Sequence, residues 1–159
     1  MGVGKTQIGK ILSKELKWPY LDNDLEVARI TGLSARELSE ISVADLHEAE
    51  NNYVRELFLR PAPFIAALPA SVGDNEELLV LLKKEFTVYL HLPVFLLAAR
   101  AGKRGIGRQA LGAGIDEVVA KRYQRRDPAY RGAASLIVEI SRSIRADAQL
   151  ILSAVDSPL

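Results

Sequence analysis

Gly2-Val3-Gly4-Lys5-Thr6 begins this chain and leads directly into apolar residues at helical spacing, among them Ile8 and Leu12. The stretch matches the second half of the phosphate-binding P-loop pattern, G-x-x-x-x-G-K-[ST]. In that loop, backbone N–H groups surround a polyphosphate, the lysine reaches the β- and γ-phosphates, and the hydroxyl ligates Mg²⁺. The sequence therefore predicts a nucleotide-phosphate site at the N-terminus of a helix.

The pattern is incomplete at its beginning. Its first glycine would lie before Met1, and so would the apolar strand that leads into such a loop. That strand is central in P-loop folds, and its loss would expose the edges of its neighbours. We therefore expect the natural chain to begin roughly ten residues earlier, which is the length of one strand and its approach to the loop.

The composition is that of a single globular domain. The chain has 159 residues, of which 48% are hydrophobic, so it can bury a core of its own. No apolar run approaches the ~20 residues that span a bilayer, and a net charge of +1 gives no general attraction to nucleic acid or anionic membrane. The absence of cysteine excludes disulfides and thiolate metal sites. We expect a cytoplasmic monomer without a membrane or nucleic-acid partner.

Strand patterns alternate with helix patterns along the chain. Short apolar stretches bounded by Pro, Gly or Asp predict strands at about residues 19–21, 64–68, 86–92 and 135–140. Apolar residues at helical spacing predict helices after Gly4 and Ser34 and at about residues 25–30, 43–59, 75–84, 115–126 and 143–155. Residues 102–114 are rich in glycine and basic residues without periodicity, which predicts a loop. The alternation predicts an α/β fold with a parallel sheet.

A set of landmarks in this order resembles the shikimate kinase family of P-loop proteins. They are Gly4-Lys5-Thr6 with Ile8-Gly9, Asp22-Asn23-Asp24, Thr31-Gly32, Val88-Tyr89-Leu90 and Arg126-Asp127-Pro128-Ala129-Tyr130. The resemblance implies one domain over residues 1–159 with a three-layer α/β/α P-loop kinase fold. Its parallel sheet would have the order 2-3-1-4-5, with the central first strand absent or truncated. A substrate-binding helical region would cover about residues 25–60, and a lid about residues 102–114.

The resemblance also implies an ATP-dependent kinase that transfers the γ-phosphoryl group of MgATP to a hydroxyl of a small hydroxy acid. The positions that match the family's nucleotide, lid and metal residues are Gly2, Gly4, Lys5, Thr6, Asp22, Arg100 and Arg108. Lys5 would bind the phosphates, while Thr6 and Asp22 would lie at the Mg²⁺ ion. Arg100 would pack on adenine. Arg108 would reach the phosphates from the lid, although it is displaced from the family's Arg-Pro-Leu-Leu position.

On the acceptor side, Asp24 matches the carboxylate that contacts the substrate hydroxyl and acts as base, and Arg126 matches the arginine that binds the substrate carboxylate. Glu50 keeps the family's glutamate, but His47 stands where a second carboxylate-binding arginine is usual. An imidazole does not replace a bidentate guanidinium. Residues 67–70, Ala-Leu-Pro-Ala, replace Thr-Gly-Gly-Gly, so side chains narrow the floor on which the acceptor would lie.

The residues leave other interpretations open. Asp22 and Asp24 are also typical of a turn that caps the following helix, and Arg126 could belong to a solvated basic run. The lost glycines and His47 favour a catalytically degenerate nucleotide- or ligand-sensing module on the same fold. A nucleic-acid-binding domain is disfavoured, because the basic loop at residues 102–114 has no aromatic platform beside it.

Overall fold

Two pairs of short parallel strands carry the fold. A computed structural model describes residues 3–97 and 115–155. The strands are β1 (Tyr20–Leu21), β2 (Ile65–Ala66), β3 (Val88–His91) and β4 (Leu136–Glu139). β1 pairs with β2 and β3 with β4, both in parallel, and no strand of the described residues joins the two pairs. The predicted α/β class with parallel strands is confirmed, whereas the sheet order 2-3-1-4-5 stays a prediction.

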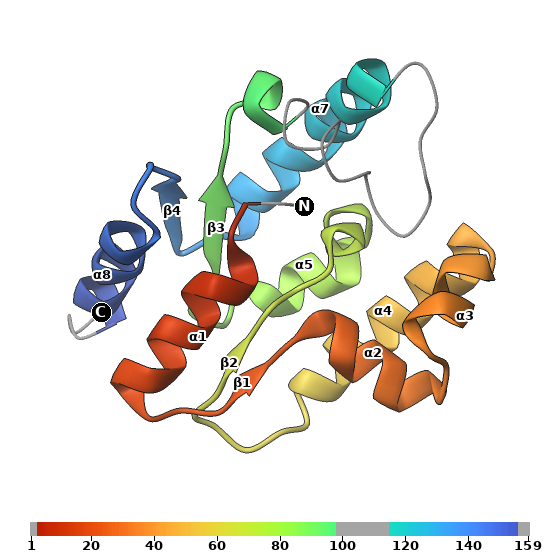
Figure 1. Cartoon of the computed structure of the whole chain (residues 1–159), viewed down its shortest axis with the longest axis horizontal. Helices are drawn as coiled ribbons and strands as arrows, with labels where there is room; N and C mark the ends of the chain where they lie inside the picture. Colours follow the sequence, from red (N-terminus) through yellow and green to blue (C-terminus); the bar gives the residue numbers. More distant parts are fainter. Residues whose placement is uncertain (1–2, 98–114, 156–159) are drawn as a thin grey trace.

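Helices pack on these strands from both sides. They are α1 (Lys5–Leu16), α2 (Asn23–Thr31), α3 (Ala35–Glu40), α4 (Val43–Leu57), α5 (Glu76–Leu82), α7 (Ile115–Ala133), α8 (Ile144–Val155) and the 3₁₀ helix η1 (Ala70–Asp74). In Figure 1, α1 crosses between the two strand pairs, and α2, α3 and α4 gather on the side away from α8. None of the helices that the structure describes combines the length and hydropathy needed to cross a bilayer.

The alternation of side chains along β3 produces the layers. Val88 and Leu90 point into a core shared with α1 and α8. Tyr89 and His91 point the other way, where their polar atoms meet Asp127 and Tyr123 of α7. Because successive side chains of a strand face opposite sides of a sheet, α1 and α8 cover one face of β3 and α7 covers the other.

A second core holds the helical region after β1. It combines buried residues of α2, α3, α4, α5 and η1, with Val27, Tyr53, Val54 and Leu78 at most 1% exposed. Local signals fix the ends of these helices. Ser34 forms a capping box with Glu37 at the start of α3, and the Asn75 side chain accepts from the Leu78 N–H at the start of α5.

α7 continues past the point where the sequence predicts its end. Asp127-Pro128 suggests a stop after Arg126, but α7 runs to Ala133 with Pro128 inside it. Proline in a helix interior removes a hydrogen bond and disfavours the helix. Tertiary contacts compensate on both sides of Pro128, because Asp127 accepts from Tyr89 at 2.9 Å and the Tyr130 hydroxyl donates to the Ala70 carbonyl at 2.5 Å.

Gly9 lets β1 pass close to α1, and this contact gives the first prediction. A Cβ at Gly9 would lie 2.3 Å from Cε2 of Tyr20, so Gly9→Ala should destabilise the protein by about 1–2 kcal/mol despite the better helix propensity of alanine. A Cβ at Gly132 of α7 would meet nothing within 4 Å, so Gly132→Ala should be neutral or slightly stabilising. Urea unfolding measures both changes. Equal stability of Gly9→Ala and wild type would contradict the close contact.

Candidate active site

Gly4 and Lys5 form the start of the phosphate-loop helix. Gly4 has a φ of +98°, in the left-handed region that favours glycine, and it caps α1. The Lys5 ammonium donates to the Leu68 carbonyl at 2.6 Å, which ties the start of α1 to the segment after β2. The turn and the lysine of the predicted motif are thus present at a helix N-terminus, where backbone N–H groups and the helix dipole favour an anion. Gly2 lies outside the described residues.

Three carboxylates act on the Lys5 ammonium through their charges. Burial lowers the pKa of the Lys5 ammonium, while the negative charges of Asp24, Glu50 and Asp22 oppose this shift. Asp24 lies in α2, Glu50 in α4 and Asp22 directly after β1, and each is near enough for its charge to raise the pKa of Lys5. The predicted phosphate-binding lysine thus lies within electrostatic range of the predicted acceptor-side carboxylates, and their membership of one site stays a prediction.

Asp22 accepts three hydrogen bonds besides its predicted metal role. Its Oδ1 accepts from the Asp24 N–H at 3.0 Å and caps α2, as the turn interpretation predicts. Its Oδ2 accepts from the Thr6 hydroxyl and from the Tyr20 hydroxyl, each at 3.1 Å. Burial raises the pKa of Tyr20 to about 12, so its hydroxyl stays a donor at neutral pH. The cap and the contact with Thr6 coexist, because they use different oxygens of one carboxylate.

Thr6 and Asp22 suit a Mg²⁺ ion that also binds phosphate. Adjacent ligands of an octahedral Mg²⁺ site lie about 2.9 Å apart, since each is 2.0–2.1 Å from the ion. The Thr6 and Asp22 oxygens are 3.1 Å apart, close to that spacing. Among the described residues, no group of three or more His, Cys, Asp and Glu could hold a metal. Two protein oxygens with phosphate and water oxygens are the usual environment of nucleotide-bound Mg²⁺.

Asp24 lies in the first turn of α2. It is exposed, and one of its oxygens accepts from the Asn23 amide at 3.1 Å. The amide oxygen of Asn23 is buried and has no hydrogen-bond partner within the described part of the chain. Asn23 itself is only 9% exposed, so the backbone that carries Asp24 is anchored in the core.

Arg126 is buried and paired, unlike a residue of a solvated basic run. It is 8% exposed, and its guanidinium binds Asp74 with Nε at 3.0 and 3.1 Å from the two carboxylate oxygens and Nη2 at 2.5 Å. Burial by itself would lower the pKa of Arg126, but Asp74 holds this pKa above its ordinary value. The Glu50 carboxylate also acts on both Arg126 and Lys5 through its charge, which links the two predicted binding groups.

The segment after β2 presents its backbone carbonyls to side chains. Ala67 O accepts from the Tyr53 hydroxyl at 3.1 Å, Leu68 O from Lys5, and Ala70 O from Tyr130. The Ser71 hydroxyl donates to Glu50 at 2.5 Å. This segment replaces the glycine run of the resemblance. Its carbonyls are held by Lys5 of the predicted phosphate site and by two tyrosines, Tyr53 and Tyr130, that were not predicted as site residues.

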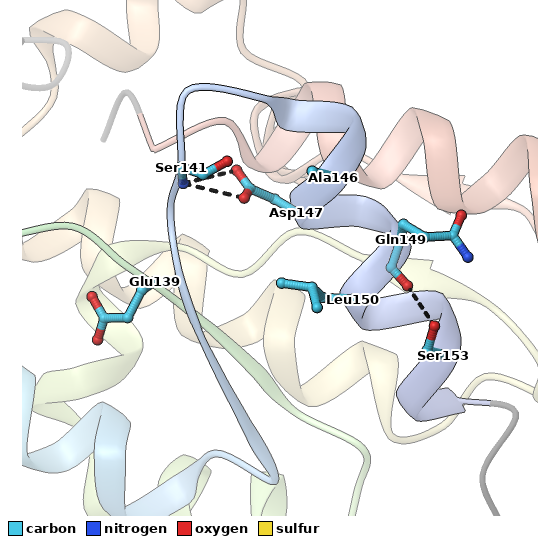
Figure 2. Close-up of a pocket in the computed structure, with 7 residues that line it drawn as sticks. All are labelled: Glu139, Ser141, Ala146, Asp147, Gln149, Leu150 and Ser153. Carbon is cyan, nitrogen blue, oxygen red and sulfur yellow. Dashed lines mark hydrogen bonds between the residues drawn. The ribbon is translucent and has the colours of Figure 1, made fainter.

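The remaining predicted residues are partly described. His47 is half-buried on α4, three residues before Glu50 and therefore on the same side of that helix. Arg100, Arg108 and the predicted lid at residues 102–114 lie outside the described residues. No predicted site residue lines the depression of about 350 Å³ between the end of β4 and α8 (Figure 2), where Asp147 accepts from the Ser141 N–H at 3.1 and 3.2 Å.

Comparisons with known proteins agree on one family. The family model described as shikimate kinase matches residues 1–156. The shikimate kinase of Hahella chejuensis is 30% identical over 139 residues, which cover 87% of this chain and 72% of that protein. The shikimate kinase from Acinetobacter baumannii, solved in complex with shikimate, superposes with a TM-score of 0.83 at 28% identity, with 98% of this chain and 88% of that one covered.

A second solved structure supports the same assignment. The shikimate kinase from Aquifex aeolicus has a TM-score of 0.81 at 26% identity and covers 98% of this chain and 92% of its own. The family model, the sequence relatives and the solved structures each cover most of the chain and carry the same family name. The chain belongs to the shikimate kinase family.

Proposed function

We propose that this chain transfers the γ-phosphoryl group of ATP to a hydroxyl of shikimate or of a closely similar hydroxy acid. The family establishes the class of enzyme, a phosphotransferase with a hydroxyl acceptor that uses ATP and Mg²⁺. The observation that carries the proposal is the arrangement at the start of α1, where Lys5 follows the Gly4 cap and the Thr6 hydroxyl donates to Asp22, two residues before Asp24. A kinase needs a cation for the phosphates, oxygens for the metal and a carboxylate at the acceptor within one site.

Lys5 and the N-terminus of α1 are proposed to bind the phosphates. The ammonium must then exchange the Leu68 carbonyl for phosphate oxygens, a stronger charge-assisted interaction. Thr6 and Asp22 are proposed to hold Mg²⁺, which when bound neutralises charge on the transferring phosphoryl group. Arg100 at the adenine and Arg108 in a lid stay predictions from the resemblance.

Asp24 is proposed to accept the proton of the acceptor hydroxyl and to orient that hydroxyl. Glu50, His47 and Arg126 are proposed to line the acceptor side of the site, within the helical region of residues 25–60. Glu50 supports this arrangement because its charge acts on both Lys5 and Arg126. We further propose a single-domain monomer that acts in the cytoplasm, with nucleotide and small acid as its ligands and no nucleic-acid partner.

A coupled assay of ADP release tests the function. With MgATP, shikimate should stimulate ADP release, and omission of Mg²⁺ should remove the stimulation. The same acid without its hydroxyls, cyclohex-1-ene-1-carboxylate, should not stimulate ADP release. Binding of ATP without any acceptor-stimulated release, across shikimate and related hydroxy acids, would favour the nucleotide-sensing alternative instead.

The affinity for ATP should depend on pH through Lys5. Burial lowers the pKa of Lys5 below the ordinary value of 10.5. The charged ammonium binds phosphate, so its contribution is present below the lowered pKa and is lost as pH rises through it. Calorimetric titration with MgATP from pH 7 upward should show the wild-type affinity falling before pH 10.5, whereas the weak residual affinity of Lys5→Met should not follow this fall. A parallel fall in both proteins would assign the pH dependence to another group.

A further inference from the structure

Asp74 binds the guanidinium of Arg126, the group that the proposed function assigns to the carboxylate of the acceptor. It accepts three hydrogen bonds from Arg126, at 2.5 to 3.1 Å, and a fourth from Arg125 at 2.9 Å. A fork of this kind is a strong and directional form of ion pair. Burial would raise the pKa of Asp74, but Arg126 and Arg125 hold this pKa below its usual value, so Asp74 is ionised at neutral pH.

The backbone around Asp74 is shaped for this pairing. Gly73 is buried, and a Cβ there would lie 2.6 Å from Cε1 of Tyr130 and 3.2 Å from Cγ of Arg126. Its missing side chain lets η1 lie directly on α7. The Tyr130 hydroxyl binds the Ala70 carbonyl at 2.5 Å and fixes the other end of η1. The close packing of η1 on α7 therefore positions Asp74 next to Arg126. This pair differs from an exposed ion pair, in which both side chains are flexible.

This pair adjoins the site that contains Lys5. Ser71 lies in the same 3₁₀ helix as Asp74, and its hydroxyl donates to Glu50 at 2.5 Å. Glu50 in turn acts through its charge on both Lys5 and Arg126. Ser71 of η1 therefore contacts a carboxylate of the proposed acceptor side, and Asp74 lies three residues further along the same 3₁₀ helix.

We propose that Asp74 is a specificity-determining residue that competes with the carboxylate of an acid acceptor for Arg126. This inference rests on the proposed function. Arg126 has five N–H donors, and Asp74 uses its Nε and Nη2. The Nη1–Nη2 edge keeps three N–H donors, but a carboxylate bound there lies beside the Asp74 charge and is repelled by it. An acid therefore binds this edge weakly or displaces Asp74 from the Nε–Nη2 edge. Acid acceptors then bind more weakly than the free guanidinium would allow, while acceptors without a carboxylate keep their affinity.

Calorimetric titration of Asp74→Asn with two ligands tests this competition without turnover. The ligands are shikimate and its methyl ester, which lacks the carboxylate charge. Asp74→Asn should raise the affinity for shikimate by about tenfold, because the charge that competes for Arg126 is removed. The affinity for the ester should change less than twofold. Glu76→Gln removes an exposed charge two residues away and should leave both affinities unchanged.

A double variant and a second substitution complete the design. Asp74→Asn combined with Arg126→Gln should lose the gain, since no guanidinium is left to bind the acid. Asp74→Ser, which removes the charge with a smaller side chain, should reproduce the gain if Asp74→Asn unfolds. Thermal melts establish that each variant is folded.

Several results would overturn the inference. They are equal shikimate affinity in wild type and the folded Asp74 variants, an equal gain for acid and ester, and no shikimate binding by any of these proteins. The proposed function fails differently, through absence of acceptor-stimulated ADP release. A gain in shikimate binding by Asp74→Asn in a protein without turnover would support the competition and contradict only the kinase activity.

Discussion

Replacement of Lys5 by alanine is expected to abolish the rise in melting temperature that MgATP gives the wild-type protein. A ligand that binds only the folded state stabilises it by RT ln(1 + [L]/Kd), so the stabilisation disappears when Kd greatly exceeds the ligand concentration. Lys5 is the proposed phosphate cation at the start of α1. We also expect kcat/KM for ATP to fall by about 10²–10³, since the ammonium stabilises charge on the transferring phosphoryl group. Thermal melts with and without MgATP and the ADP-release assay measure the two effects.

The controls separate binding from folding. Lys5 balances three carboxylates and holds the Leu68 carbonyl, so its removal lowers stability without ligand as well. The relevant quantity is therefore the shift caused by MgATP in each variant. Lys5→Met keeps most of the side-chain volume and should also lose the shift, whereas Lys10→Ala, an exposed lysine of the same helix, should keep it. A full shift in Lys5→Met would disprove the phosphate role.

Much of the fold could be predicted because its signals are local. Aromatic and β-branched residues predict the strand β3. Ser34 and Asn75, with their capping partners, indicate where α3 and α5 begin. The end of α7 could not be predicted in this way. Pro128 is a local signal to stop, and it is overridden by contacts of Asp127 and Tyr130 with residues 38 and 60 positions away in the sequence.

The candidate site likewise contains residues that local motifs predict and residues that only the fold brings together. Gly4, Lys5 and Thr6 form a contiguous motif, and Asp22 and Asp24 follow a strand, so their proximity could be predicted from the resemblance. The pairing of Asp74 with Arg126 spans 52 residues and follows no motif. Gly73 is the one hint in the sequence. Its missing side chain lets η1 approach Tyr130 and Arg126 of α7, and this contact is visible only in the folded structure. Ser71 and Tyr53 could not be predicted as neighbours of the site either, because their partners Glu50 and Ala67 are distant in the sequence.

Replacement of Asp24 by asparagine is expected to lower kcat for acceptor phosphorylation by about 10²–10⁴ while the dissociation constant for MgATP changes less than twofold. The asparagine amide has nearly the same shape but does not take a proton, so general base catalysis is lost. Asp24 is exposed at the first turn of α2, whereas Asp22 rather than Asp24 accepts from Thr6 at the proposed metal position. Nucleotide binding should therefore survive. ADP release at saturating acceptor and calorimetry with MgATP measure the two quantities.

The two carboxylates at this turn make the assignment of the base testable. Asp22→Asn should weaken Mg²⁺-dependent ATP binding but keep the cap of α2, because the asparagine amide oxygen also accepts from the Asp24 N–H. Glu15→Gln, an exposed charge change on α1, should alter neither binding nor turnover. If Asp24→Asn keeps full activity, another group accepts the proton. If Asp24→Asn instead loses affinity for MgATP, Asp24 acts on the metal or the phosphates. A base for the acceptor hydroxyl contributes to turnover and does not change the affinity for the nucleotide.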